Sequence, residues 1–588
     1  MTNQTPSGSS LPRSSILAEQ VLVTAALCLA AYSLLWTSIL WFRYHPHLPW
    51  RDLFLLLEQV QDLEQASLGP ATFLQWFEPH YVAHRVAVPR LLLWLDINVL
   101  AGQNHMFFVA GWACLLILIA LYTRLARAHF RQSGTTLFVA ALAVIWLFAP
   151  AHLWNLLNPI NISWHLTLTF SLLAFWVLIR CPQAPRWRDW GLAYLLCSLA
   201  AFCNFGGVIA WLLLPVLALM LHARVIVPTL LLSVVLAWLY AGGMSSDATL
   251  ATQWDLGSPE VIAQIQAQAQ SVLAANTPWR ILVKTLQFLA WPLTESAPGL
   301  ALLLSLLSVE VLAAVAIFGL RSRWYPQSRL QAWMVFCMMA AALCLGIALA
   351  TQLGRLMLHP NHIHGPSYER YETVVVVYWL SISGLLLGLK PRLGRWAYLL
   401  LATLLILAVT LQRPAGGYLS QEIQNMEVAG SLFTIGEQAQ RTGLRPKAGN
   451  RFTPEFVFTF DELLRDRQLA YRAPIELPDG LADVQQCSPT EVQMNTAAGQ
   501  LIIKVSRDLP AAWWSRSITV YRGNSLVGRL GPLHKGDFRP FSLLNPRLNS
   551  WQGTVSIGRE ADAYDLTLVL QQPLGTTAWC ELAVPAAT

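Results

Sequence analysis

Charge is scarce in this sequence. Asp, Glu, Lys and Arg together make up 12% of the 588 residues, whereas 55% are hydrophobic and 25 are Trp. A soluble protein carries about a quarter charged residues, so this composition excludes an ordinary soluble enzyme. Apolar runs of about 18 residues recur between short basic clusters. The pattern predicts an α-helical polytopic membrane protein with about eleven transmembrane helices.

Several catalytic motifs are also missing. The sequence has no G-x-S-x-G, no Walker loop, no dinucleotide fingerprint and no C-x-x-C, so hydrolase, ATPase and redox functions lack support. The formal net charge is +7. However, Lys and Arg gather beside the apolar runs, as they do in cytoplasmic loops of membrane proteins. We therefore expect a lipid bilayer as a partner and no nucleic acid.

The apolar runs indicate how the chain crosses the bilayer. Residues 1–15 are rich in Ser and predict a disordered cytoplasmic amino terminus. No small-residue cleavage site follows the first run, which predicts an uncleaved span. Residues 191–223 are too long for one span, and Cys203–Gly207 divides them into two. Residues 16–411 thus predict the transmembrane domain, with the amino terminus in the cytoplasm and the carboxyl terminus outside.

The composition after residue 411 becomes that of a soluble chain. Residues 412–480 predict a connecting segment, and residues 481–588 contain alternating runs such as LIIKVS and DLTLVLQQ. Period-two alternation broken by Gly, Asn and Pro predicts a small antiparallel β-sandwich domain on the outer side. Cys487 and Cys580 are its two cysteines, and an outer compartment permits disulfides. We expect these two to pair, with two free buried thiols as the alternative.

The first long polar loop, Arg51–Arg90, gathers carboxylates, imidazoles, guanidiniums and aromatic rings. Such a mixture at a membrane boundary favours a reaction site for an anionic, partly sugar-like substrate. Asp52 begins an expected helix directly after the first span and is suited to act as a general base on an acceptor hydroxyl. Capping of the helix is the alternative role. Glu78 and His80 are further candidates for the base or for acceptor binding, or else form structural hydrogen bonds.

Cations also occur on the outer side, where the charge rule does not require them. Phosphate is a natural partner for them because the guanidinium fork binds its oxygens in pairs. The alternatives are anchoring to lipid headgroups and pairing with nearby carboxylates. These outer cations are Arg43, Arg51, Arg85, Arg90, Arg280, Lys284, Arg355 and Arg370.

Two other polar clusters each allow a functional and a structural interpretation. One is a loop cluster of His359, His362, His364, Glu369 and Glu372, for which a divalent metal is one interpretation and a polar loop near substrate is the other. The second is an outer turn with aromatic and amide side chains that suit a sugar ring, although interfacial Trp belts explain them equally. Its members are Trp154, Asn155, Asn158, Asn161 and Trp164.

Three short elements carry a family resemblance over residues 16–411. They are Ala83-His84-Arg85 with Pro89-Arg90, Phe205-Gly206-Gly207 in a middle helix, and Gly354-Arg355 followed by Tyr368-Glu369-Arg370-Tyr371. This arrangement resembles the C-type (GT-C) membrane glycosyltransferases, which use polyprenyl-phosphate sugar donors on the non-cytoplasmic face. It is also similar to bacterial membrane proteins with related elements.

The resemblance implies a bacterial inner-membrane enzyme that transfers a sugar to a periplasmic glycan, lipid or protein acceptor. Asp52 would correspond to the catalytic carboxylate, and Arg355 and Arg370 would lie near the donor phosphate, with Arg85 and Lys284 assisting. The expected substrate-binding residues are His84, Arg90, Tyr371 and Trp154. The sequence identifies no certain cofactor, and a divalent metal stays open. A flippase for a lipid-linked glycan and a non-catalytic envelope assembly protein are the alternatives.

Overall fold

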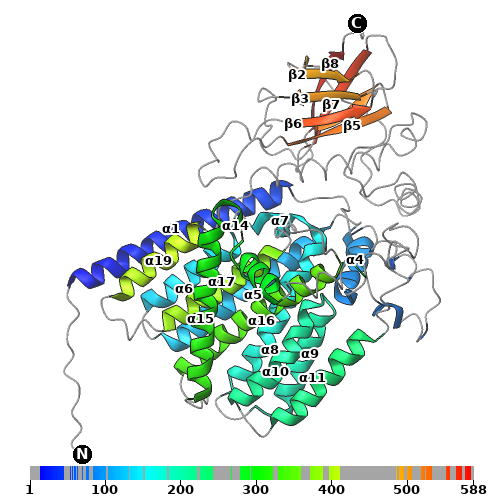
Figure 1. The fold of residues 1–588 in the computed structure, drawn as a ribbon. Coiled ribbons are helices and arrows are strands. Elements are labelled where there is room, and N and C mark those ends of the chain that lie inside the picture. The colour runs from blue at the N-terminus through cyan, green and yellow to red at the C-terminus, as the bar shows by residue number, and fades with distance from the viewer. Residues whose placement is uncertain are drawn as a thin grey trace, which may run out of the picture.

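A computed structural model describes most of a helical bundle and the strands of a carboxyl-terminal sheet (Figure 1). The described residues are 13–44, 53, 56, 59–60, 63, 69, 74–78, 84–100, 104–130, 133–149, 152–181, 185–221, 225–242, 267, 278–291, 293–321, 329–358, 371–388, 396–410, 485–486, 489–495, 500–505, 518–522, 525–532, 551–556, 564–571 and 577–584.

The bundle is built from consecutive apolar helices, as the hydropathy of the sequence predicts. Its helices are α1 (Arg13–Tyr44), α4 (Ala87–Leu100), α5 (His105–His129), α6 (Ser133–Leu147), α7 (Leu153–Leu157), η2 (Pro159–Asn161), α8 (Ile162–Ile179), α9 (Trp187–Ala201), α10 (Gly206–Leu221), α11 (Ile226–Ala241), an unlabelled helix at 278–289, α14 (Leu293–Ser296), α15 (Pro298–Arg321), α16 (Arg329–Leu358), α17 (Glu372–Gly388) and α19 (Trp396–Thr410).

Several helices are suited to a bilayer. Five of them, among the described residues, are long and apolar enough to cross it: Leu17–Ile39, His105–His129, Pro159–Ile179, Pro298–Ile317 and Ala332–Leu353. Shorter apolar helices accompany them at Ser133–Leu147, Gly206–Leu221, Ile226–Ala241, Glu372–Gly388 and Leu399–Val409. These helices fit a helical protein embedded in a membrane, while the count of eleven spans stays a prediction.

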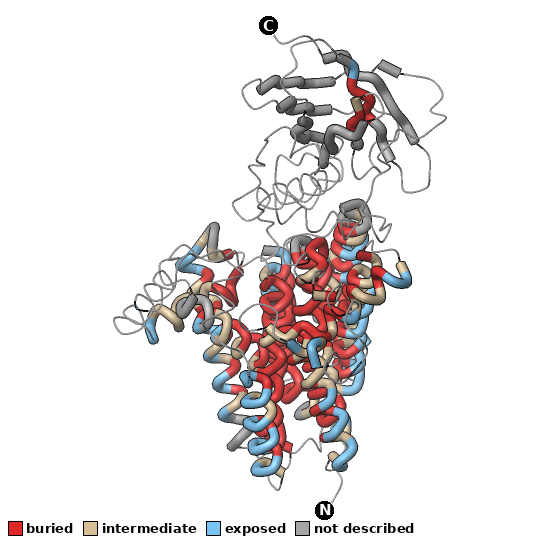
Figure 2. Tube along the Cα trace, turned by 90° about the vertical axis from the view of Figure 1, so that its right-hand side faces the viewer, coloured by how far each residue is buried: buried red, intermediate tan, exposed pale blue. Residues whose placement is uncertain are grey.

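The centre of the bundle is formed by α8, α16 and α17. The apolar window of α8 is 83% buried and that of α16 is 67% buried, against 28% for α15. Buried positions accordingly fill the interior of the bundle, and exposed positions lie on its outer helices (Figure 2). Because lipid tails are as apolar as Leu, exposed leucines are expected on the outer helices of such a fold.

The predicted break at Cys203–Gly207 falls between two helices, whereas their identity as two separate spans stays a prediction. α9 ends at Ala201, and α10 begins at Gly206. A Cβ atom on Gly207 would lie 2.2 Å from the carbonyl carbon of Ala200, so only glycine permits this approach of the two helices.

The carboxyl-terminal strands hydrogen-bond in the order β1-β8-β7-β4-β5-β6-β3-β2. They are β1 (Gln485–Gln486), β2 (Pro489–Asn495), β3 (Gln500–Val505), β4 (Ile518–Arg522), β5 (Ser525–Pro532), β6 (Trp551–Ser556), β7 (Tyr564–Gln571) and β8 (Thr577–Val584). All neighbours are antiparallel except β1 and β8. The packing of a two-layered sandwich stays a prediction.

The expected disulfide also stays a prediction. Cys487 lies outside the described residues, and Cys580 lies in β8 with its side chain outside the description. The connecting segment 412–480 and the amino-terminal residues 1–12 fall outside as well.

Candidate functional site

The first polar loop is held against the bundle by one apolar face. Its described helical positions include Leu53, Leu56, Val60 and Leu63, which are all buried and recur every three or four residues. This spacing places them on one side of a helix. The first three belong to one hydrophobic cluster with residues of α4, α5 and α8. Asp52, directly before Leu53, lies outside the described residues.

Arg90 fastens this loop to α4. The side chain is 1% exposed. Its Nε and Nη2 donate to Oε1 of Gln59 at 3.1 and 2.8 Å, and Nη1 donates to the carbonyls of Trp76 at 2.7 Å and Glu78 at 2.8 Å. Burial lowers the pKa of Arg90 to about 10, although the nearby Glu78 raises it. Arg90 therefore positions two segments of the loop, one at Gln59 and one at Trp76 and Glu78, and most of its donors are occupied.

Arg85 joins the first loop to the end of α11. Its Nε donates to the carbonyl of Tyr240 at 2.9 Å, Nη1 donates to that of Phe77 at 2.6 Å, and Nη2 donates to that of Gly242. The guanidinium also lies 5.7 Å from the centre of the Tyr240 ring. Three of its five N–H groups are thus occupied by the backbone. Glu78, in contrast, is exposed.

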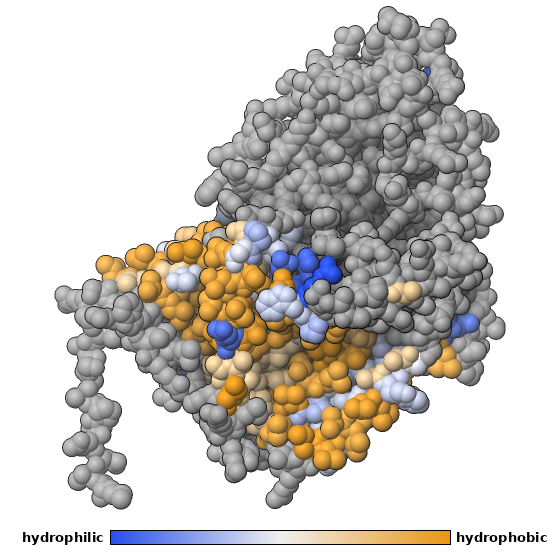
Figure 3. Space-filling model, viewed as in Figure 1, coloured by the Kyte–Doolittle hydropathy of each residue, from blue (hydrophilic) through white to orange (hydrophobic). Residues whose placement is uncertain are grey.

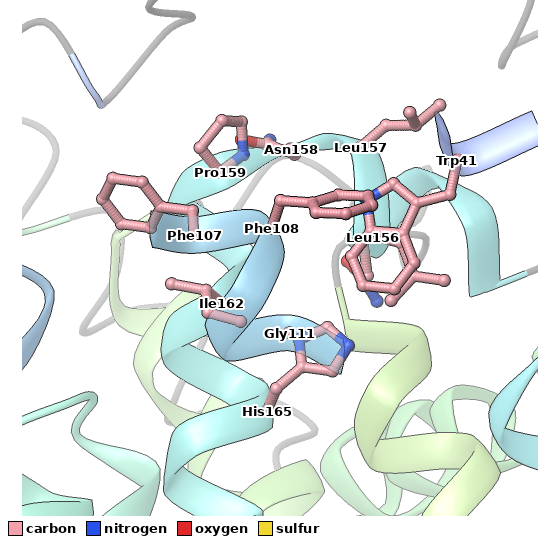
Figure 4. A pocket seen from close by; sticks show the side chains of 11 residues that line it. Trp41, Phe107, Phe108, Gly111, Leu156, Leu157, Asn158, Pro159, Ile162 and His165 are labelled. Atoms are coloured by element: carbon pink, nitrogen blue, oxygen red, sulfur yellow. The ribbon is translucent and has the colours of Figure 1, made fainter. Parts of the chain in front are cut away.

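A pocket lies where the ends of α1, α5 and α8 meet the turn formed by α7 and η2 (Figure 4). Its cavity volume is about 10 Å³, which is room for about one water molecule, so a larger ligand requires the lining side chains to move apart. We call it the turn pocket. Its lining consists of Trp41, Phe107, Phe108, Gly111, Asn155, Leu156, Leu157, Asn158, Pro159, Ile162 and His165.

Close aromatic packing shapes one wall of the turn pocket. The Trp41 ring meets the edge of Phe108 with 4.9 Å between centroids and stacks on Trp112 at 5.4 Å. This stacking depends on Gly111, because a Cβ atom there would lie 2.8 Å from the Trp41 ring. The wall is therefore apolar and tightly packed, and Trp41 itself is buried.

Four buried polar atoms of the turn pocket have no hydrogen-bond partner among the described residues. They are Nε1 of Trp41, Nδ2 of Asn155, Oδ1 of Asn158 and Nε2 of His165. A buried polar atom left without a partner costs about 1–3 kcal/mol, so a ligand that forms hydrogen bonds with these four atoms would be stabilised. Donors and acceptors beside an aromatic wall suit a ligand that carries hydroxyl groups.

Two buried histidines connect the turn pocket to α17. The rings of His152 and His165 stack at 4.9 Å. In His152, Nδ1 lies 2.9 Å from the carbonyl of Leu147, and Nε2 lies 2.8 Å from Oγ1 of Thr373. Burial lowers the pKa of His152 to about 4, so the ring is neutral at pH 7. Its Nδ1 therefore donates to the carbonyl, and its Nε2 accepts from Thr373.

Tyr371 joins two further segments to this region. Its ring lies 5.2 Å from that of Trp164 on α8 and 5.3 Å from that of Phe288 on the helix at 278–289. Tyr371 directly follows Arg370 in the chain, and Phe288 lies one helical turn after Lys284. Burial lowers the pKa of Lys284, and Arg280 lowers it further. Neighbours in the sequence of two expected phosphate-binding residues, Arg370 and Lys284, thus pack near the turn pocket.

The remaining expected site residues are only partly described. His84 is half-buried, beside Arg85. Trp154 lies in α7 and Arg355 in α16, both with side chains outside the description, while His80 and Arg370 are not described. Of the expected metal loop, only Glu372 is described, and it is buried at the start of α17. No group of three His, Cys, Asp or Glu side chains among the described residues is arranged to hold a metal.

The sequence did not single out Trp41, His152 or His165 as site residues. Ionisable side chains inside apolar runs are uncommon, and that rarity is the signal that identifies the two histidines. Asn155 and Asn158, which the sequence indicated as part of a sugar-binding turn, do line the turn pocket.

The fold fits a helical membrane protein, and a polar and aromatic pocket lies where several of its helix ends meet. Compared with known proteins, the chain matches no family model, no curated protein and no solved structure.

Proposed function

We propose that this protein is a membrane glycosyltransferase of the bacterial inner membrane. It would transfer a sugar from a polyprenyl-phosphate donor to a glycan, lipid or protein acceptor on the periplasmic side. The observation that carries the proposal is the turn pocket, where partnerless donors and acceptors adjoin the Trp41 and Phe108 rings. A sugar offers hydroxyl groups to the partnerless donors and acceptors and a ring face to the aromatic side chains.

The position of the turn pocket supports the same function. Trp41 lies in the last turn of α1, before the first polar loop, and Phe107 and Phe108 lie at the start of α5. The basic clusters of the sequence assign both helix ends to the outer side. Lipid-linked donors present their sugars at that interface, while their chains stay among the apolar helices.

The proposed reaction is a single displacement. Asp52 takes the proton of an acceptor hydroxyl, and the hydroxyl oxygen forms a bond to the anomeric carbon of the sugar. The bond between that carbon and the phosphate oxygen breaks, and the polyprenyl phosphate leaves with the electron pair. Arg355 and Arg370, with Lys284, stabilise the negative charge on the departing phosphate. Arg85 and Arg90 hold the loop that carries Asp52.

Transfer from a panel of polyprenyl-phosphate sugars, with membrane extract as acceptor, tests the reaction. We expect Asp52→Asn to lower kcat by about 10²–10⁴-fold because the base is lost. Arg370→Ala should lower it by about 10²–10³-fold because charge on the leaving phosphate is no longer stabilised. Asp62→Asn, which changes a carboxylate on the same loop, should leave kcat unchanged.

A variant of the turn pocket separates sugar binding from chemistry. Asn158→Ala should raise the KM for the donor about tenfold with little change in kcat, because it removes a contact made equally in the ground and transition states. Normal donor kinetics in Asn158→Ala would exclude the turn pocket as the sugar site. Absence of transfer with every donor would favour the flippase or assembly function.

A further inference from the structure

A single carboxylate interrupts the apolar outer face of α15. Glu310 lies at the centre of this helix and is exposed. It has no hydrogen-bond or ion-pair partner among the described residues. The exposed positions around it follow helical spacing and form one stripe, which we call the α15 stripe: Leu300, Leu303, Leu306, Leu307, Glu310, Ala313, Ala314 and Ile317.

The surroundings of Glu310 are hydrocarbon-like. The large side chains of the stripe are 43 to 52% exposed. α15 is the least buried of the five long apolar helices. Figure 3 shows a broad hydrophobic surface on this side of the bundle, with a small hydrophilic spot over α15. Charged side chains within a span are costly in lipid, and they usually face a partner rather than the acyl chains.

The described part of the chain does not supply that partner. Every Lys and Arg on its described apolar helices lies within the first or last two turns of its helix, as Arg124 and Arg127 do on α5. A second copy of the described helices therefore offers no cation at the depth of Glu310. Ala313 and Ala314, one turn further along the stripe, have small side chains that allow another helix to approach closely.

We propose that the α15 stripe is the docking surface for a transmembrane helix of another protein that carries a Lys or Arg at mid-depth. The partner's cation pairs with Glu310, and its apolar side chains pack along Leu303, Leu307 and Ala314. The ion pair fixes both the register and the choice of partner, because an apolar helix without the cation leaves Glu310 buried and unpaired.

Fluorescence resonance energy transfer tests this interface. It measures association between the labelled full-length protein and labelled synthetic peptides in phosphatidylcholine vesicles. The probe is a Leu/Ala-rich peptide of about 22 residues with one central Lys, and its matched control has Leu at that position. We expect the Lys peptide to associate at least about tenfold more tightly than the control peptide. Glu310→Gln and Glu310→Leu should abolish the difference, whereas Leu302→Ala, on a less exposed position of α15, should retain it.

Charge reversal provides a second readout. Glu310→Lys should associate with a peptide carrying a central Glu and no longer prefer the Lys peptide. Equal association of wild type with the Lys and Leu peptides would overturn the proposal. Self-association of the protein that disappears in Glu310→Leu would also overturn it, because the occupant would then be a second copy.

Discussion

Asp96 shows how a single buried carboxylate organises the site. It lies on α4 and is fully buried. Its Oδ2 accepts the N–H of Asn104 at 2.7 Å, and its Oδ1 accepts that of Met106 at 2.8 Å. These groups belong to the free amino end of α5, where a carboxylate is stabilising. Asp96 thereby fixes the helix that brings Phe107 and Phe108 to the turn pocket.

The environment of Asp96 predicts a pH dependence of stability. Burial raises its pKa above the ordinary value of 3.8, although the backbone N–H groups oppose that shift. The folded state therefore binds this proton more tightly than the unfolded state does, and the contribution of Asp96 to stability falls as the pH rises from 3.8 through the folded pKa. Asn has no carboxyl group to titrate, so the stability of Asp96→Asn should lack this pH-dependent contribution.

Thermal unfolding in detergent at a series of pH values measures the effect. The unfolding midpoint of wild type should decline relative to that of Asp96→Asn as the pH rises through this window. Asp96→Ala should lower the free energy of unfolding by about 1–2 kcal/mol at low pH, because the cap itself is lost, and this difference from wild type should shrink as the pH rises through the same window. Parallel pH curves for wild type and Asp96→Asn would contradict this account.

The sequence indicates which residues are important more readily than it indicates which groups they contact. Arg85 and Arg90 were expected to bind phosphate or substrate because their guanidiniums lie on the outer side. In the structure most of their N–H groups reach backbone carbonyls and Gln59. A guanidinium satisfies either kind of acceptor, and the sequence does not reveal which acceptors the fold brings near. Asn158 was easier to interpret, because its turn already carried the aromatic neighbours.

At the scale of elements, the contact between α9 and α10 depends on one missing side chain. Gly207→Ala would place a methyl group 2.2 Å from backbone atoms of Ala200 and Ala201. Backbone atoms cannot rotate away, so we expect a loss of about 3 kcal/mol or more in the free energy of unfolding. Thermal unfolding and expression level in membranes are the measurements.

Gly191→Ala is the matched control for that variant. Gly191 also lies in α9, but nothing lies within 4 Å of the position of its Cβ atom. Alanine there should be neutral or should add up to about 1 kcal/mol through helix propensity. Equal unfolding midpoints for both variants would show that the α9–α10 contact is not tight.

Helices were predictable because hydropathy is a local property of the sequence. The division at Cys203–Gly207 follows from length and from the polar Asn204 alone. The stacking of His152 on His165 was not predictable, because it depends on how α8 approaches the residues after α6. The hydrogen bond between His152 and Thr373 joins residues that are 221 positions apart. Long-range contacts of this kind require the packed bundle.

For the whole molecule, the basic clusters predict which loops face the cytoplasm. In intact spheroplasts a membrane-impermeant maleimide should label Ser246→Cys, which follows α11 and is expected on the outer side, but not Gln183→Cys, beside Arg180 and Arg186. Permeabilised cells should label both. A carboxyl-terminal tag should be accessible from outside. Labelling of Gln183→Cys alone in intact cells would invert the topology and place the proposed chemistry on the cytoplasmic side.

The hydrogen bond from Arg85 to the carbonyl of Gly242 can form only late in the synthesis of the chain. The two residues are 157 positions apart. At about 5–20 residues per second, the ribosome needs about 8–30 s to reach the second after making the first. During that interval the nascent first loop lacks its tie to α11. A chaperone or insertase that shields this loop would therefore act before α11 emerges and would become dispensable once the tie has formed.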